Sequence, residues 1–421
     1  MATDVDVQFF SHLNGLVLGN NWGDMIRLLD TCLVNGLPLP SVTSASVDSQ
    51  GDITLNLYAD HKSLLFQIVE LSGFEPVEIN GKYRIKGTPT TIKLILKATH
   101  VGKTVTKIGT AKLTSLGYDV VFRDSADIKR VYRAKNPRAE HPFTRVDETI
   151  SDGTNSYTST YAKSAMVGLI ENMTHIDDYQ DTSKLQLPLD NTDFTKNWKI
   201  SGTGTSVVRG WSRWYWSRAG DVTNNAQDVS TPNNNNRSFT LLGDLDAFYI
   251  VRNIGLNSSL KSIIGCGLFN SALKNDVIPN WFLATALQAN TAGTSINLTN
   301  SLDGSVPLAL NVNASKVFTC AFNEKSRISS SIACDLITPD YQSGFSDIYS
   351  SNNVAALEIP LKDSNKYLRG TLKYLYYNGK NLNIASTACY FADNSMYVAE
   401  AFYANSASSI GSPIFYLGEL E

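Results

Sequence analysis

Two pairs of adjacent carboxylates are the residues in this chain whose chemistry could cleave a substrate. Asp147-Glu148 and Asp177-Asp178 each place two acids side by side. A glycosidase needs two carboxylates held about 5 to 9 Å apart across a cleft. Neighbouring residues on a strand point to opposite faces, so neither pair acts in this way alone, and only one carboxylate from each pair could converge. The sequence therefore favours no enzymatic activity, and a glycan-degrading enzyme is the weakest of three functional hypotheses.

Other catalytic or metal-binding patterns are missing from the sequence. No Gly-x-Ser-x-Gly elbow and no Gly-x-x-x-x-Gly-Lys-Ser/Thr phosphate loop occurs. The five histidines lack the i, i+3 or i, i+4 spacing that places two ligands on one helix face: His12, His61, His100, His141 and His175. We therefore expect no enzyme, no metal and no cofactor.

The five cysteines are widely spaced and form no Cys-x-x-Cys motif. A disulfide framework belongs to small, cysteine-dense domains, which this chain is not. We expect buried free thiols at all five positions: Cys32, Cys266, Cys320, Cys334 and Cys389.

An aromatic cluster offers a second kind of site. Trp211, Trp214, Tyr215 and Trp216 lie within six residues. Exposed aromatic side chains stack on sugars, so Trp211, Trp214 and Trp216 are the candidates for glycan binding. Packing in a core or an interface is the favoured interpretation, because tryptophan is a preferred anchor in both.

The strongest local charge feature is a basic segment between residues 123 and 145. It holds seven cations, offset by Asp124, Asp127 and Glu140: Arg123, Lys129, Arg130, Arg133, Lys135, Arg138 and Arg145. A solvated loop is one interpretation, and an interface that meets carboxylates of a partner is the other. We expect Arg130, Arg133 and Arg138 to face another subunit. Nucleic acid is an unlikely partner, because the net charge is −3.

A helix is predicted near the N-terminus. Trp22, Met25, Ile26, Leu29 and Leu33 form a single apolar stripe at helical spacing. The helix would begin after Asn20 or Asn21 and end before Gly36. Its stripe needs a surface, either in this chain or on a neighbouring subunit, and Trp22 and Leu29 are the candidates for partner contact.

After this arm, residues 1–40, the pattern changes to alternation with period two. Residues 41–122 predict a small β module, in which Ile53, Leu55 and Leu57 face inward and Asn80-Gly81 forms a type I′ hairpin turn. Residues 123–421 hold many short apolar runs between polar loops, which indicates a larger β-sandwich-like domain.

Size and composition agree with this mainly β class. The chain has 421 residues, 43% hydrophobic and 18% charged, enough for two or three domains with a substantial core. No apolar run reaches the length of a membrane-spanning helix. The first residues, MATDVDVQFF, lack the features of a secretory signal.

Three segments carry a resemblance to a known family. They read VYRAK at 131–135, TRVDE at 144–148 and ENMTHID at 171–177. In this order they resemble an uncharacterised family of structural virion proteins of tailed bacteriophages. The hairpin-like string at 69–85 and the string LGDLDAFY at 242–249 are similar to further segments of that family. The glycine-containing turn of the relatives is absent at 61–65, where this chain reads HKSLL.

The resemblance implies a structural subunit of the tail, baseplate or neck, assembled in the host bacterial cytoplasm. Its partners would be other virion proteins and copies of itself in cyclic symmetry, with no membrane involved. A receptor- or glycan-binding tail appendage is the alternative. The family supplies no active site to transfer to this chain.

Overall fold

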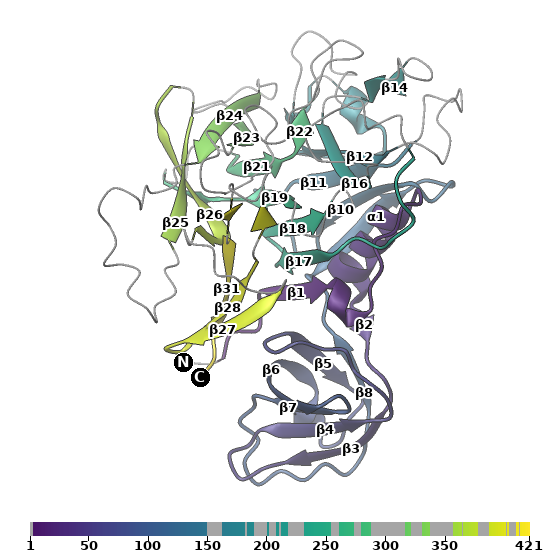
Figure 1. Cartoon of the computed structure of the whole chain (residues 1–421), viewed down its shortest axis with the longest axis vertical. Helices are drawn as coiled ribbons and strands as arrows, with labels where there is room; N and C mark the ends of the chain where they lie inside the picture. Colours follow the sequence, from purple (N-terminus) through teal and green to yellow (C-terminus); the bar gives the residue numbers. More distant parts are fainter. Residues whose placement is uncertain are drawn as a thin grey trace.

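The structure, a computed structural model, consists of a small β module below a larger β body (Figure 1). The two chain ends lie close together near the junction. The structure describes residues 3–149, 162–181, 183–188, 200–201, 208–209, 212–217, 231–253, 261–272, 279–287, 316–320, 331–336, 357–363, 365–377, 387–400, 402–403, 410–411 and 413–421. The sheets are antiparallel, and the predicted mainly β class with a short N-terminal helix is confirmed.

The module is one curled sheet with the strand order β2-β8-β5-β6-β7-β4-β3. Its inward positions alternate as predicted, with Ile53, Leu55 and Leu57 buried on β4. The strands are β2 (Leu37–Pro38), β3 (Val42–Val47), β4 (Ile53–Leu57), β5 (Ile68–Ser72), β6 (Gly81–Thr90), β7 (Lys93–Leu96) and β8 (Thr110–Leu113). The next strand, β9 (Tyr118–Arg123), falls within the predicted module but pairs with β10 in the body.

Asn80-Gly81 does not form the predicted type I′ turn. Asn80 has φ −76°, whereas that turn needs a positive φ at both central residues. An eight-residue connection containing the short 3₁₀ helix η3 (Val77–Ile79) joins β5 to β6 instead. The Asn80 amide donates to the carbonyl of Phe74 at 2.9 Å and accepts from its N–H at 2.8 Å. The asparagine therefore closes a longer loop by side-chain bonding.

The body contains two large sheets that pack face to face. The ring of Phe248 on β18 meets Trp214 on β16 and Tyr118 on β9 edge to face, with centroids 5.9 Å apart in both pairs. Aromatic pairs in this arrangement stabilise a core beyond simple burial. The predicted sandwich-like packing is therefore present between these strands.

The smaller body sheet has the order β22-β16-β12-β11-β10-β9, with β13 also pairing with β12. The larger sheet joins 13 described strands in the order β1-β17-β18-β19-β21-β23-β24-β25-β26-β31-β28-β27, with β20 beside β26. Two short pairs, β14–β15 and β29–β30, complete the described strands. The short apolar runs at 239–242, 247–251 and 414–417 all lie in strands of the larger sheet.

The body strands have these bounds. The smaller sheet contains β9, β10 (Lys129–Ala134), β11 (Phe143–Asp147), β12 (Lys163–Ile170), β13 (Gln186–Leu187), β16 (Ser212–Ser217) and β22 (Ala286–Leu287). The larger sheet contains β1 (Gln8–Ser11), β17 (Phe239–Gly243), β18 (Ala247–Asn253), β19 (Lys261–Leu268), β20 (Asn270–Ser271), β21 (Trp281–Ala284), β23 (Lys316–Cys320), β24 (Ser331–Leu336), β25 (Leu357–Lys362), β26 (Leu368–Tyr377), β27 (Ala388–Ala392), β28 (Ser395–Ala399) and β31 (Pro413–Glu419). The short pairs are β14 (Ile200–Ser201) with β15 (Val208–Arg209) and β29 (Phe402–Tyr403) with β30 (Ile410–Gly411).

The predicted helix is present as α1 (Asp24–Leu29), which continues as a π-helical segment, η2 (Asp30–Asn35). It ends at Gly36, which has φ 75°, as the sequence indicated. Its N-cap is Gly23 and not Asn20 or Asn21, so that expectation is wrong. The carboxyl oxygens of Glu148 accept from the N–H groups of Gly23 and of Ile26, the latter at 2.7 Å. A distant acid therefore caps the helix in place of a local asparagine. Further 3₁₀ turns are η1 (His12–Asn14) and η4 (Asp178–Gln180).

The N-terminal arm is part of the body. Strand β1 pairs with β17, and Phe9 and Phe10 are fully buried. The Gln8 side chain donates to the carbonyls of Ile68 and Thr114 in the module at 2.8 and 3.0 Å. The arm therefore contributes to the core and to the junction, and removing it would expose both.

Arg84 on β6 joins the module to the body. Its guanidinium is fully buried and donates to the backbone carbonyls of Asp4 (2.7 and 3.0 Å), Val7 (2.9 Å), Phe66 (2.7 Å) and Leu417 (3.0 Å). These carbonyls belong to the N-terminal arm, the module and the last strand. One side chain therefore holds three parts of the chain together.

Three of the four described cysteine side chains are buried free thiols, as the sequence predicted. Cys32, Cys266 and Cys320 are buried free thiols, and Cys389 is a partly buried one. The side chain of Cys334 lies outside the described residues. None of the described helices is long and apolar enough to cross a membrane.

Candidate functional site

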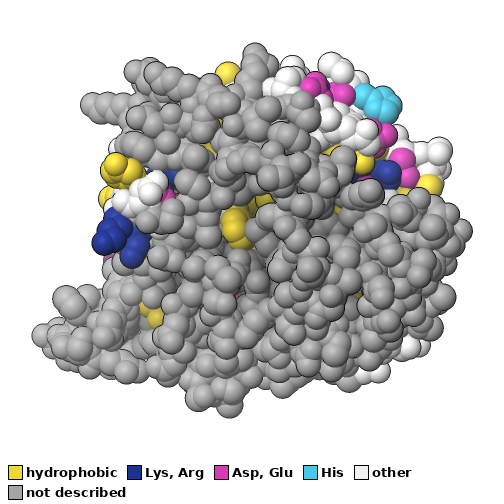
Figure 2. Space-filling view, turned by 90° about the horizontal axis from the view of Figure 1, so that it is seen from above, with side chains coloured by type: hydrophobic (Ala, Val, Ile, Leu, Met, Phe, Trp, Pro, Cys, Tyr) yellow, Lys and Arg dark blue, Asp and Glu magenta, His cyan; other side chains and the backbone are white. Residues whose placement is uncertain are grey.

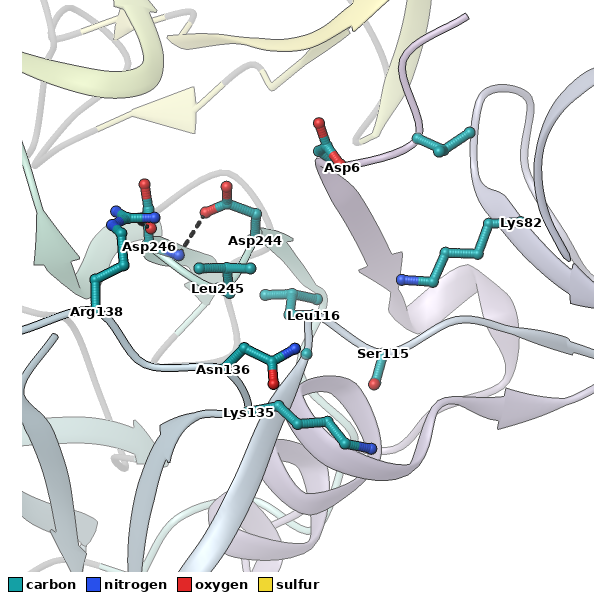
Figure 3. A pocket seen from close by; sticks show the side chains of 12 residues that line it. Asp6, Lys82, Ser115, Leu116, Lys135, Asn136, Arg138, Asp244, Leu245 and Asp246 are labelled. Carbon is teal, nitrogen blue, oxygen red and sulfur yellow. Dashed lines mark hydrogen bonds and ion pairs between the residues drawn. The ribbon is translucent and has the colours of Figure 1, made fainter.

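A cavity of about 380 Å³ lies where the arm, the module and the body meet (Figure 3). Its wall combines the arm, strand β6, the segment that leads out of the module, the segment after β10 and the β17–β18 turn. Charged and polar side chains dominate this wall. The lining residues are Val5, Asp6, Lys82, Ser115, Leu116, Gly117, Lys135, Asn136, Arg138, Asp244, Leu245 and Asp246.

Asp246 is the centre of an ion-pair cluster at one side of this junction cavity. Its carboxylate lies 2.7 Å from the guanidinium of Arg138 and 2.8 Å from Nε2 of His141, and it also pairs with Lys373. Although burial opposes ionisation, the bonds from His141 and Lys373 hold the pKa of Asp246 below its usual range. This carboxylate is therefore ionised and already satisfied within the chain.

Asp244, two residues earlier, has a different environment. Its carboxylate accepts from the phenol of Tyr374 at 2.6 Å and from the N–H groups of Asp246 and Ala247. Burial raises the pKa of Asp244, and burial beside this carboxylate raises the pKa of Tyr374. Tyr374 also has φ 62°, a conformation that bulky residues rarely adopt. The pair fixes the turn against β26 and leaves the phenol as a donor, not as a base.

Other parts of the cavity wall carry side-chain donors with no hydrogen-bond partner among the described residues. Lys82 extends from the module toward the cavity, and Lys135 and Asn136 lie across from it (Figure 3). Both lysine side chains are exposed. Because Asp244 and Asp246 are bonded internally, the amines remain available for an acceptor from outside. The cavity can therefore bind a carboxylate or a backbone carbonyl, but it holds no nucleophile activated by a base.

Of the three arginines expected to face a partner, Arg138 lines this cavity. Its side chain is half exposed and bonds to Glu140 at 2.6 Å as well as to Asp246. Arg130 is 1% exposed and pairs with Asp30 at 3.1 Å and with Asp127. The guanidinium of Arg133 lies 4.3 Å from the ring centre of Phe143. Arg130 therefore has no surface to offer a partner, which corrects the expectation for that residue.

The predicted helix residues also face inward. Leu29 is fully buried in the chain's own core, which corrects the expectation that it contacts a partner. Trp22 is partly buried, and its ring meets that of Trp216 edge to face at 6.0 Å. The apolar stripe is thus covered by this chain and needs no neighbouring subunit.

The aromatic cluster belongs to the core in its described part. Trp214 and Trp216 are fully buried, and the indole N–H of Trp214 donates to the carbonyl of Ala284 at 3.0 Å. Neither ring has a face on which a sugar could stack, so the glycan-binding assignment of these two residues is wrong. Trp211 lies outside the described residues.

The two carboxylate pairs meet at one arginine. Arg145 is fully buried and lies 3.0 Å from Asp147 and 3.5 Å from Asp177. Asp178 pairs with Lys184 at 2.7 Å, and Glu148 caps the helix. One acid of each pair does converge, as hydrolysis would require, but a cation neutralises them. The four acids therefore hold structure together.

Of the five histidines, all of which the structure describes, only His175 in the 174–181 loop is exposed. His175 is 69% exposed and lies 4.0 Å from Asp177. Figure 2, which looks down on the body, shows a histidine among acidic side chains at one margin of that face. No group of three metal-binding side chains is found among the described residues.

Sequence reasoning missed Arg84, Lys82 and Asp246. Arg84 sits beside inward-facing Tyr83 and Ile85, where a charged residue looks like an ordinary surface position. Asp246 lies in the LGDLDAFY string, which stands out for its resemblance but not as a site. The acidic turn that precedes the aromatic strand β18 could have indicated this site. The basic segment at 123–145 contains cations that could have been considered as its partners.

No family model and no curated protein matches this chain. Its function is therefore inferred from the sequence resemblance and from the geometry of the described residues.

Proposed function

We propose that this chain is a structural subunit of a tailed-bacteriophage virion, placed in the tail, baseplate or neck and acting through protein–protein assembly. One observation carries the proposal. Two of the segments that resemble phage virion proteins lie on the adjacent strands β10 and β11, and the third follows β12, which pairs with β11. These three segments, which are separated in the sequence, therefore lie close together in one folded unit.

The chemistry of the described side chains supports a binding role. The buried acids and arginines neutralise one another, as in the Arg145–Asp147 and Arg130–Asp30 pairs. The junction cavity, by contrast, keeps exposed amines on Lys82 and Lys135. Charged groups at such a surface steer and align partners more than they add affinity. We propose that an acidic segment of a neighbouring virion protein binds in this cavity.

We expect the double variant Lys82→Ser/Lys135→Ser to enter particles several-fold less efficiently than the unaltered chain. Both amines would be lost from the cavity, while the buried core and the Arg84 junction remain. The measurement is the amount of each chain in purified particles from host cells that supply the variant. The unfolding midpoint of the isolated chain should stay unchanged.

A matched control removes the same charge elsewhere on the module. Lys103→Ser/Lys107→Ser changes two lysines whose side chains are 45% and 62% exposed and that lie outside the cavity lining. This control should enter particles at the normal level. Equal incorporation of the cavity variant and the control would count against a partner in the junction cavity.

Glycan binding is not proposed as a second function. Two of the three tryptophans on which that alternative depended, Trp214 and Trp216, are buried. The lining of the junction cavity also contains no aromatic residue.

A further inference from the structure

The module ends in a strand with one open edge. Strand β3 is the last in the sheet order β2-β8-β5-β6-β7-β4-β3, and it pairs with β4 alone. Figure 1 shows β3 at the end of the module that is farthest from the body. The backbone groups on its outer side are therefore accessible to another chain.

Hydrogen bonds at the two ends of β3 show which residues point outward. Asp48 N–H donates to Asp52 C=O at 3.0 Å, and Tyr58 N–H donates to Ser41 C=O at 2.9 Å. Bonded and non-bonded positions alternate along an antiparallel pair. Ser44 and Ser46 consequently direct their backbone groups to β4, and Ala45 and Val47 direct theirs away from the sheet.

This edge lacks most of the features that normally prevent strand pairing. Natural edge strands are protected by lysine, proline, short length or bulges. The segment 41–47 reads SVTSASV, with no charge and no proline. The opposite edge, β2, is two residues long and ends in Pro38. A bulge between Val42 and Ser44 is the one protection visible on β3, and it leaves the half from Ser44 to Val47 regular.

We propose that β3 is a dimerisation strand, through which two copies of this chain pair antiparallel about a two-fold axis at Ala45. With the axis at this position, the outward N–H and C=O of Ala45 bond to the C=O and N–H of Ala45 in the second copy. The same register places Val47 opposite Thr43, which lies at the bulge. Ser44 lies opposite Ser46 on the exposed face, twice in the dimer. The two modules thereby form one continuous sheet.

A second copy fits this edge better than a strand of a charged protein. Identical strands bring like residues together, and a charged edge would repel itself. The exposed side chains here are Thr43, Ser44 and Ser46, which form neutral cross-strand pairs. Two-fold pairing of one patch is also the commonest closed symmetry of protein oligomers. This inference does not depend on the proposed virion role.

Two charge variants test both the contact and its register. Ser44→Lys/Ser46→Lys places lysine opposite lysine in the proposed dimer, whereas Ser44→Glu/Ser46→Lys places glutamate opposite lysine. Both variants lose the same bond from the Asn56 amide to Ser44 Oγ. The oligomeric state of the full chain would be measured by sedimentation velocity over a concentration series, with thermal unfolding as a check on folding.

We expect the unaltered chain to reach twice its mass of 46.1 kDa as concentration rises. The double-lysine variant should remain monomeric with an unchanged unfolding midpoint, and the glutamate–lysine variant should dimerise at least as well as the unaltered chain. A monomeric unaltered chain at all soluble concentrations would refute the proposal. Equal loss of dimer in both variants would refute the register.

Discussion

Replacing Arg84 with methionine should strongly destabilise the folded chain. The guanidinium is fully buried and bonds to four backbone carbonyls from three parts of the chain. Methionine fills part of the volume but leaves these carbonyls without donors. The variant loses hydrogen bonds to a charged group and leaves buried carbonyls unpaired. These two effects together should lower the free energy of unfolding by about 3 to 5 kcal/mol. Chemical denaturation would measure it.

The exposed Lys82 on the same strand provides the control. Lys82→Met removes a cation of similar length from β6 and should change the unfolding free energy by less than about 0.5 kcal/mol. Arg84→Lys should resemble Arg84→Met, because an ammonium cannot span the carbonyls that a planar guanidinium reaches. If Arg84→Met is as stable as Lys82→Met, Arg84 does not hold the junction together.

Glu148 should make the chain less stable as the pH rises from about 4.5 to about 8. Burial raises the pKa of Glu148 from 4.5 to about 8, although the N–H groups of Ile26 and Gly23 partly offset this. In that range the folded state holds a proton that the unfolded state has released. Linkage then requires the free energy of unfolding to fall as the pH rises across this window. Above the window Glu148 is ionised in both states and adds no further pH dependence.

The test compares the unaltered chain with Glu148→Gln, whose side chain cannot ionise. The difference in unfolding free energy between the two should shift in favour of Glu148→Gln as the pH is raised from about 5 to about 8. The control is Glu358→Gln on β25, where the side chain is exposed. It should show no such shift. A constant difference between Glu148→Gln and the unaltered chain at every pH would mean that the helix cap is ionised throughout.

The strands and the helix could be predicted because their signals are local. Ile53, Leu55 and Leu57 alternate with polar residues, and Met25, Ile26 and Leu29 repeat at helical spacing. Such periodicity follows from the geometry of each element. The predicted turn at Asn80-Gly81 was wrong although its signal is also local. There η3 and the hydrogen bonds of the Asn80 amide stabilise a longer loop.

The site could not be predicted, because it depends on contacts between distant segments. Asp246 gathers Arg138, His141 and Lys373, of which Arg138 is 108 positions away and Lys373 is 127. The helix cap likewise comes from Glu148, which is 122 positions from Ile26. For the same reason the sequence favoured a partner for the basic segment, although Arg130 and Arg145 find their carboxylates within the chain.

The most direct test of the proposed function is to look for the chain in intact phage particles purified from host cells that express its gene. Density-purified particles would be analysed by mass spectrometry for the chain and by electron cryomicroscopy for its position. We expect repeated copies in the tail, baseplate or neck, with an acidic segment of a neighbour in the cavity lined by Lys82 and Lys135. A chain that is abundant in infected cells but absent from purified particles would contradict the structural role.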